Sequence, residues 1–561
     1  MSQSNQSAAK RSPWLTLVAV LAIGLPVGIR FNHNLDAPIQ DVDESTWVFS
    51  SYYYHLAFQR GDWFHPNWQS RDAYDHRPLV PWVFGAALAT QGLVETSLEN
   101  RLYWDAHAYD LYGWPAFLDE LNRRTPAAAL KTLRTVSLGF GLITLFLIYL
   151  LGAQINSGIG MTAAVIVAWH PLYQQYCSLA MPDTQVMAWI SAGLLLQFHL
   201  AKQLETMEGG TGTLIAWLSL LALVLALGVL TKANAAMTWI TWLAICAVKA
   251  VTSKTVRSRQ CFIAAGIGVG IGAWVFCVAL YPTLWPHPID NFISIFQHRL
   301  EWVAMQRRYS FEHAFSDWGR QFIFAVKHLF FPGQSLWQWL VMPLTFVGSL
   351  MGSVLLARES TRNDGDNRAG FPLLLLLTAA LICAQTFITF HLNWARYLLP
   401  ALPMISVVAA YGLVRGIEPL WQGDIQSLTT FHRSLLQPWI LISIVVAVAV
   451  LVCAGPLQIP VNTLTGLEFM IRKHENFLHF HPKAATLKAE FAVRLMDGGD
   501  QEQAEKMWKE ALTPDPQEEV LPIYPRKLQF FEDAAKRYPS HKPLQDWLKI
   551  VRERAKTYRP E

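Results

Sequence analysis

Long apolar stretches recur along the sequence and constrain its fold more than any other feature. The first, at 14–29, follows the basic pair Lys10 and Arg11, and because no small-residue cleavage site follows it we expect an uncleaved span. Ten more lie at 133–152, 158–174, 184–201, 213–231, 235–250, 261–281, 337–357, 371–390, 397–414 and 438–455. Each is close to the ~20 residues that a helix needs to cross ~30 Å of hydrocarbon, so we predict an all-α polytopic membrane protein with about eleven spans.

The composition supports a membrane protein and excludes several other classes. Only 15% of the 561 residues are charged, whereas soluble domains have about a quarter. The net charge of +4 is too small to indicate a nucleic-acid-binding protein. The six cysteines are scattered, mostly within apolar runs, with no spacing typical of a disulfide framework or a metal site. A disordered chain, a disulfide scaffold and an ordinary soluble enzyme are therefore excluded.

Basic residues in the short loops predict the orientation of the spans, since such loops are usually cytoplasmic. These residues are Lys10, Arg11, Lys249, Lys254, Arg257, Arg259, Arg358, Arg362, Arg368, Arg415 and Arg433. One threading places all of them in the cytoplasm, and it places the long segments 31–132 and 282–336 outside, together with the C-terminal tail. We expect a bacterial cytoplasmic (inner) membrane, with the endoplasmic reticulum as the open alternative.

The two external segments are not plain hydrophilic loops. Apolar residues recur at helical spacing over 289–305 and again over 311–329, which predicts amphipathic helices lying along the membrane surface. The apolar stretch from Pro78 to Val94 begins with two prolines and is interpreted as a juxtamembrane helix rather than a span.

The charged tail predicts a small helical extracytoplasmic domain over 466–561, separate from a transmembrane domain over 1–465. Ala504, Trp508 and Ala511 have the spacing of the second helix of a tetratricopeptide unit, after a turn at 498–500. Because one such unit cannot bury a core alone, both docking of a protein partner and capping of the membrane domain remain open roles.

Ionisable residues are nearly absent from the middles of the predicted spans, which counts against an ion-coupled transporter. They lie instead at span ends, and in the threading above they all emerge on the outer face: Asp41, Asp43, Glu44, Asp183, Lys232 and Arg396. Each residue also has a purely structural interpretation, because the cations can snorkel to headgroups and the carboxylates can cap helices. Their joint placement predicts an outward-facing site.

These residues stand in short motifs that resemble those of GT-C glycosyltransferases. The pair Asp43-Glu44, the stretch 61–66 and the element His76-Arg77-Pro78-Leu79 resemble the first external loop of that superfamily. Within it, the chain is most similar to the family of protein O-mannosyltransferases and aminoarabinose lipid A transferase (glycosyltransferase family 39-like). His76-Arg77-Pro78 departs from that family's double-proline form.

Three further positions carry the resemblance, which covers roughly 14–455. Asp183 falls where the family has a second Asp, Lys232 ends a Leu-Thr-Lys element, and Arg396 and Tyr397 begin an Arg-Tyr-x-Leu-Pro element. The resemblance implies a GT-C-type helix bundle. It also implies inverting transfer of a sugar from a polyprenyl-phosphate donor to an acceptor on the outer side.

The resemblance also implies roles for these residues. Asp43 would be the general base, Glu44 would orient the acceptor or hold a cation, and Asp183 would position a cation or bind acceptor. The donor phosphate would be bound by Arg396, Lys232, Arg77 and Tyr397. Membrane lipids and the lipid-linked sugar are the expected partners.

A divalent metal is a further possibility, since members of the family differ in metal use. His65, His76 and His107 share the first loop with many carboxylates, so Mg²⁺, Mn²⁺ or Zn²⁺ could be held there. No tight ligand spacing is present, and both cases stay open.

Two other functions are compatible with a chain of this class. A transporter or flippase for lipid-linked glycans would need a polar path through the membrane, and a membrane-anchored scaffold would bind through its helical tail. The sugar, hexosyl or pentosyl, and the acceptor, a protein, a lipid A-type sugar or another glycan, are not determined by the sequence.

Overall fold

The structure, a computed structural model, describes most of the two expected domains. The described residues are 24–25, 27–41, 43–70, 73–74, 76–97, 121–206, 210–253, 255–309, 318–331, 336–361, 370–389, 394–421, 471, 478, 483–513 and 525–557. All regular elements among them are helices, which confirms the predicted all-α class. Most of the expected first span and the whole of the expected last span, 438–455, lie outside the described residues.

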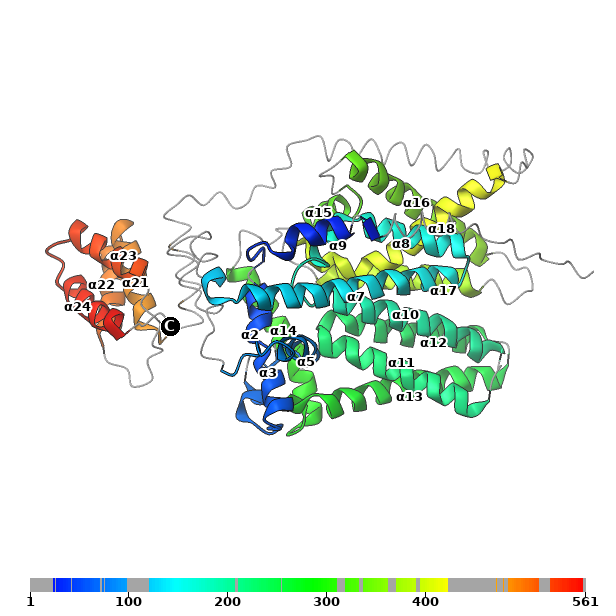
Figure 1. The fold of residues 1–561 in the computed structure, drawn as a ribbon, viewed down its shortest axis with the longest axis horizontal. Helices are drawn as coiled ribbons and strands as arrows, with labels where there is room; N and C mark the ends of the chain where they lie inside the picture. Colours follow the sequence, from blue (N-terminus) through cyan, green and yellow to red (C-terminus); the bar gives the residue numbers. More distant parts are fainter. Residues whose placement is uncertain are drawn as a thin grey trace, which may run out of the picture.

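Six helical stretches in the described part are long and apolar enough to cross a membrane. They are Ala127–Ala153 (α7), Thr211–Thr231 (α11), Ala233–Thr252 (η3 and α12), Val256–Leu280 (α13), Phe371–Ile388 (in α17, Gly370–Thr389) and Ala395–Gly416 (η7, Ala395–Ala401, and the start of α18, Leu402–Trp421). Figure 1 shows α7, α11, α12 and α13 running in roughly the same direction, along the long axis of the molecule. These helices confirm a multi-pass membrane protein.

The expected spans at 158–174, 184–201 and 337–357 are helical as well. The first divides into α8, Ser157–Trp169, and the short α9, Pro171–Tyr176. The break falls at His170 because a residue before proline is disfavoured in the α conformation. The other two are α10, Asp183–Thr206, and α16, Leu336–Thr361, which contains Pro343.

Short helices form the described parts of the two long connecting segments. The first segment contains α2, Asp43–Phe49; α3, Tyr52–Tyr54; the π-helix η1, His55–Gln59; η2, Pro66–Gln69; and α5, Leu79–Ala89. The second contains η4, Pro282–Leu284; α14, Pro288–Tyr309; and α15, Trp318–Phe330. Helices therefore occupy the positions expected for amphipathic and juxtamembrane helices, although 311–317 lies outside the described residues.

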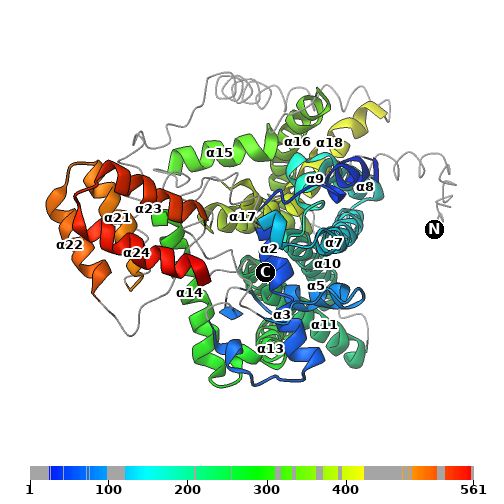
Figure 2. The same ribbon diagram turned by 60° about the vertical axis from the view of Figure 1, so that its left-hand side comes forward.

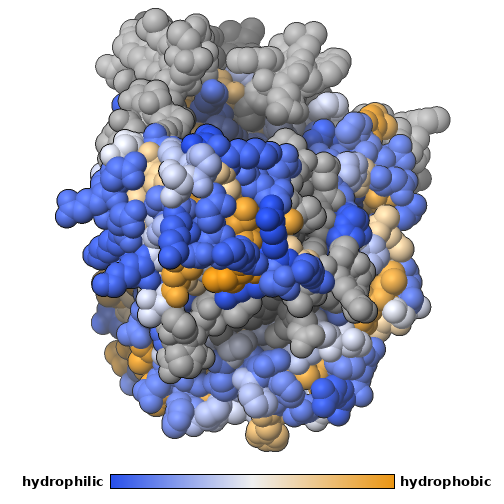
Figure 3. All heavy atoms as spheres, turned by 90° about the vertical axis from the view of Figure 1, so that its left-hand side faces the viewer, coloured by the Kyte–Doolittle hydropathy of each residue, from blue (hydrophilic) through white to orange (hydrophobic). Residues whose placement is uncertain are grey.

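Four helices in the described part of the tail pack around a core of their own. They are α21, Ala485–Asp497; α22, Gln501–Leu512; α23, Pro525–Arg537; and α24, Lys542–Thr557. The turn expected at 498–500 joins α21 to α22, and Gly499 adopts a φ of 82° there, which favours glycine. Figure 2 shows these helices as a compact group, and Figure 3 shows that their outward face is mostly hydrophilic. The tail thus contains a second helical hairpin, α23 and α24, which the sequence pattern did not indicate.

Glycines allow α16 and α18 to pack backbone against backbone. A Cβ added at Gly412 would lie 2.1 Å from the carbonyl oxygen of Gly348, and one added at Gly352 would lie 2.0 Å from that of Val408. Close approach through small residues is a common way for helices to associate in membranes. Lipid is as apolar as the side chains, so association depends on close packing rather than on the hydrophobic effect.

We expect Gly412→Leu to lower the free energy of unfolding of the membrane domain by ~1–3 kcal/mol, because the new side chain overlaps the α16 backbone. The midpoint of thermal unfolding of the detergent-solubilised protein measures this effect. Gly268→Leu on α13 is the matched control, since a Cβ there meets nothing within 4 Å. Equal midpoints for the two variants would contradict the packing described here.

Candidate active site

Charged side chains from distant parts of the sequence meet at one end of the bundle as two ion-paired groups. In the first group, Nη1 of Arg396 lies 2.7 Å from Oδ2 of Asp43 and 3.3 Å from Oδ2 of Asp41. In the second, Nζ of Lys232 lies 2.8 Å from Oδ1 of Asp183. Five of the six residues expected on one face therefore come together here: Asp41, Asp43, Asp183, Lys232 and Arg396.

Helix ends position most of these groups. Asp43 and Asp183 stand in the first turns of α2 and α10, where the helix dipole stabilises negative charge. Lys232 is the C-cap residue of α11, where a positive charge is favoured. Arg396 is carried by the 3-10 helix η7, directly before α18.

An aromatic pair links the two groups. Nζ of Lys232 lies 5.6 Å from the centre of the Tyr397 ring, and Cζ of Arg396 lies 5.7 Å from the same ring. Trp394 stacks on Tyr397 with 6.0 Å between ring centres, and its own ring lies 5.3 Å from Cζ of Arg396. Rings at these distances attract both cations and hold them next to each other.

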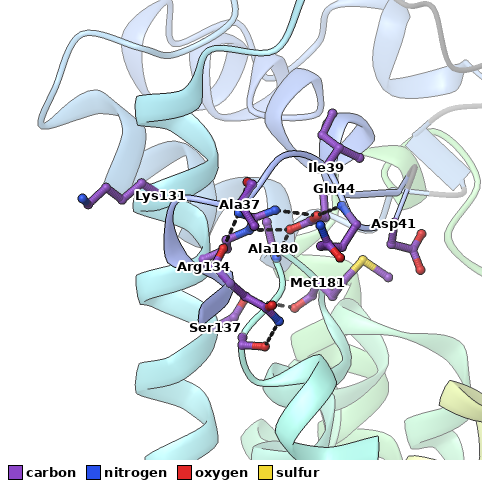
Figure 4. A network of polar contacts seen from close by, with 12 residues as sticks. Ala37, Ile39, Asp41, Glu44, Lys131, Arg134, Ser137, Ala180 and Met181 are labelled. Carbon is purple, nitrogen blue, oxygen red and sulfur yellow. Dashed lines mark hydrogen bonds and ion pairs between the residues drawn. The ribbon is translucent and has the colours of Figure 1, made fainter. Parts of the chain in front are cut away.

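Glu44 is not presented to this site, because it is fully buried in an ion pair with Arg134 of α7. Nε of Arg134 donates to Oε1 of Glu44 at 2.8 Å, and Nη2 donates to Oε2 at 2.9 Å. Neither side chain has any exposed surface. Figure 4 shows this two-pronged contact at the centre of a network that joins the N-terminal loop to α7.

The remaining polar atoms of the pair bind the backbone around it. Arg134 donates to the carbonyl oxygens of Asn34 and Ala37, both at 2.6 Å, and to that of Pro38 at 3.0 Å. Glu44 accepts hydrogen bonds from the backbone N–H groups of Gln40 and Ala180, both at 2.9 Å. The pair thus fixes three segments together: the loop that carries Asp41, the start of α2, and the residues just before α10.

Burial changes the protonation of Asp41. Loss of solvent raises the pKa of its carboxyl group to about 6, outweighing the opposing effect of Arg396, and the charges of Asp43 and Glu44 raise it further. Burial also raises the pKa of Tyr176, at the end of α9, whose hydroxyl feels the charges of Arg396, Asp41 and Asp183. Tyr176 therefore lies among the charged groups, although the sequence did not single it out.

One carboxylate oxygen of the site lacks a partner among the residues that the structure describes. Asp183 is buried, and its Oδ1 binds Lys232, whereas no described residue forms a hydrogen bond with its Oδ2. A buried acceptor without a partner is costly in a folded protein, and a ligand hydroxyl can satisfy it.

The other predicted site residues have different surroundings. Arg77 is buried just before α5, His76 contacts the Trp47 ring edge-on at 5.2 Å, and Nδ1 of His65 accepts the backbone N–H of Asn67 at 3.1 Å. His107 lies outside the described residues. Within the described ranges, no three His, Cys, Asp or Glu side chains are grouped so that they could hold a metal ion, and we derive no step through one.

We expect Arg134→Met to lower the free energy of unfolding by ~3–5 kcal/mol, because it leaves the Glu44 carboxylate buried without its partner. Lys131→Met, one turn earlier on α7, is the matched control: Lys131 pairs with Asp36 at 3.0 Å on the surface, and such pairs contribute ~1 kcal/mol or less. Chemical unfolding of both variants in the same detergent measures the difference. A loss for Arg134→Met no larger than for the control would show that the pair does not hold these segments together.

Comparison with known proteins gives matches at the level of structure only. No protein-family model matches the sequence, and no curated protein matches it. The structure is similar to ArnT from Cupriavidus metallidurans bound to undecaprenyl phosphate, with 14% identity and a TM-score of 0.44, over 89% of this chain and 76% of ArnT.

Two structures from Archaeoglobus fulgidus are similar as well. One is the Archaeoglobus fulgidus oligosaccharyltransferase tethered to an acceptor peptide with an NVT sequon, at 13% identity and a TM-score of 0.41. The other is AglB of the same organism with an inhibitory peptide and a dolichol-phosphate, at 12% identity and a TM-score of 0.42. The matches cover 98% of this chain but only 60% and 61% of the archaeal chains.

Proposed function

We propose that this protein is an inverting glycosyltransferase whose active site lies on the outer face of its membrane. It moves a sugar from a polyprenyl-phosphate donor to an acceptor. The observation that carries the proposal is the meeting of Asp41, Asp43 and Arg396 with Asp183 and Lys232 at one end of an apolar helix bundle. Carboxylates and cations in one partly buried site match the two demands of the reaction, which are a proton acceptor and a stabiliser for a leaving phosphate.

The proposed step is a single displacement at the anomeric carbon. The acceptor hydroxyl attacks the face opposite the phosphate, and the bond between the anomeric carbon and the phosphate oxygen breaks with its electron pair going to phosphate. Arg396 and Lys232 stabilise the negative charge that gathers there, since cations in a poorly solvated site act strongly on a developing anion. Tyr397 keeps both cations in reach of one phosphate, and the apolar spans accommodate the prenyl chain.

The acceptor proton passes to the carboxylate pair Asp41 and Asp43, with Asp43 as the residue next to the acceptor. Nη1 of Arg396 lies 2.7 Å from Asp43 and 3.3 Å from Asp41, so one guanidinium contacts both carboxylates. Burial raises the pKa of Asp41 to about 6, which is near the pH at which a general base works best.

Two further assignments follow from the contacts of the acidic residues. Asp183 accepts a hydroxyl of the sugar or of the acceptor through its unpartnered Oδ2, while its other oxygen holds Lys232 in place. Glu44 holds the loop through Arg134 rather than contacting substrate or a cation, because neither of its oxygens is exposed.

We propose that the protein lies in a bacterial cytoplasmic membrane. Its acceptor would be a protein Ser or Thr, a lipid A-type sugar or another glycan. We propose that the two helical hairpins of the tail, α21–α22 and α23–α24, act as tetratricopeptide-like units that dock a protein partner. Transport of a lipid-linked glycan without bond cleavage would instead favour a flippase.

Replacement of the proposed base tests the reaction most simply. We expect Asp43→Asn to lower the rate of sugar transfer 10²–10⁴-fold, because general-base assistance is lost while the shape of the side chain is kept. Transfer of radiolabelled sugar from polyprenyl phosphate in isolated membranes is the measurement, and the unfolding temperature checks the fold. Asp36→Asn, at an exposed carboxylate earlier in the same loop, should keep wild-type activity. Near-normal transfer by Asp43→Asn would remove Asp43 from this role.

The pH dependence of sugar transfer tests whether Asp41 takes part in accepting the proton. A base works only when deprotonated, so the wild-type rate should fall as the pH drops through about 6, the raised pKa of Asp41. In Asp41→Asn the fall near pH 6 should disappear, because the carboxyl group whose pKa burial raises is no longer present. An unchanged acid limb in Asp41→Asn would show that Asp41 does not take part in the titration.

A further inference from the structure

A cluster of aromatic side chains lies apart from the charged groups, at the far end of the first connecting segment. It unites the π-helix η1, the loop after it, α5, and the residue after η4. Its members, here called the aromatic cluster, are Phe58, Trp63, Phe64, Trp82 and Trp285.

The rings form one continuous surface. Trp63 stacks on Trp285 with 6.1 Å between ring centres and meets Trp82 edge-on at 5.8 Å. Phe58 contacts both Trp63 and Trp82, at 5.4 and 5.3 Å, and Phe64 lies 5.3 Å from Trp285. Aromatic pairs at such distances stabilise each other beyond simple burial.

The backbone holds this cluster in an outward position. Gly61 turns the loop with a φ of 66°, Nε1 of Trp68 donates to the carbonyl of Asp62 at 3.1 Å, and Nε1 of Trp285 donates to the carbonyl of Val278 at 2.8 Å. Even so, Phe64 is 85% exposed and Phe58 is 52% exposed. Phe64 is the most exposed large hydrophobic side chain among the described residues, and a fixed loop that presents such a ring needs an apolar environment to receive it.

The lipid-facing surface of α13 leads directly to this cluster. Ile263, Ile267, Ile271 and Val275 recur every fourth residue on α13 and are all at least half exposed, so they form one apolar stripe along a span. The stripe runs toward the end of α13, after which η4 and Trp285 follow. The last turns of α13 and α11 share one small core, so this is the end of the bundle that also carries Lys232.

We infer that the aromatic cluster is a membrane anchor, inserted at the boundary of headgroups and acyl chains in the leaflet next to the charged site. Tryptophan is enriched at this boundary. Because the indole N–H of Trp285 already donates to Val278, the cluster meets the lipid through its apolar rings, with Phe64 extending toward the acyl chains. Arg60, exposed at the edge of the cluster, is placed to meet lipid phosphates.

The anchor has a mechanical consequence for the site. The helices α2, α3 and η1 run from Asp43 to Gln59, a stretch that spans at most ~25 Å at the rise of a helix. The buried Glu44–Arg134 pair fixes one end of this stretch, and the aromatic cluster fixes the other. Together they set the depth at which Asp41 and Asp43 face the membrane.

Photocrosslinking in proteoliposomes of phosphatidylethanolamine and phosphatidylglycerol tests the anchor. The photoreactive residue p-benzoyl-phenylalanine replaces Phe64, Ile267 on the lipid-facing stripe, or the exposed Asp36 in three separate variants of the full chain. Mass spectrometry then identifies what is attached after illumination. We expect phospholipid adducts at position 64 at a level similar to position 267, and several-fold above position 36.

Two results would overturn the inference. One is the absence of lipid adducts at position 64 while position 267 yields them. The other is a predominance at position 64 of adducts to a second copy of this chain or to a glycan, because either would identify a different occupant. All three sites are exposed, so the variants should fold, and the positive control at position 267 confirms insertion.

Discussion

The buried ion pair between Glu44 and Arg134 is the interaction on which the arrangement of the charged site depends. Removing two charges from water is costly, and such a pair is tolerated only when other hydrogen bonds complete its shell. Here carbonyl groups of residues 34–38 and the N–H groups of Gln40 and Ala180 do so. One contact thereby places Asp41 and Asp43 relative to the segment that leads into Asp183.

Burial and the surrounding charges together set the protonation of Asp41. Three carboxylates, Asp41, Asp43 and Asp183, face two cations, Arg396 and Lys232. Burial raises the pKa of Asp41 to about 6 against the effect of Arg396, and the negative charges of Asp43 and Glu44 raise it further. An entering phosphate would compete with these carboxylates for the same cations and so favour proton uptake by the pair.

Much of this architecture could be predicted from the sequence, because span length and apolar composition are local properties. The predicted spans, the helices of the external segments and the gathering of Asp43, Asp183, Lys232 and Arg396 all followed from such patterns. The partner of Glu44 did not, because ion pairing across 90 residues depends on how helices pack. One feature of the sequence does indicate a role for Arg134. It is a lone arginine in the predicted span 133–152, where a charged side chain needs a partner.

Other features were beyond reach for similar reasons. Asp41 lies 3.3 Å from Arg396 and Asp43 lies 2.7 Å from it, and this difference cannot be read from the order of residues. Tyr176 lies at the end of α9 because the chain breaks at His170 and Pro171, so its place among the charged groups depends on that break. The aromatic cluster unites residues more than 200 positions apart, and only the three-dimensional packing of η4 against the first segment brings them together.

The central claim, that the paired carboxylates and cations break the bond between a sugar and a lipid phosphate, is tested most directly by the lipid-linked sugars of the cell. Mass spectrometry of lipid extracts can compare cells with the protein, cells without it, and cells that carry Lys232→Met. A polyprenyl-phosphate sugar should accumulate when the protein is absent, return to normal with the wild-type chain, and stay high with Lys232→Met. An unchanged pool in all three, or full restoration by Lys232→Met, would contradict the account.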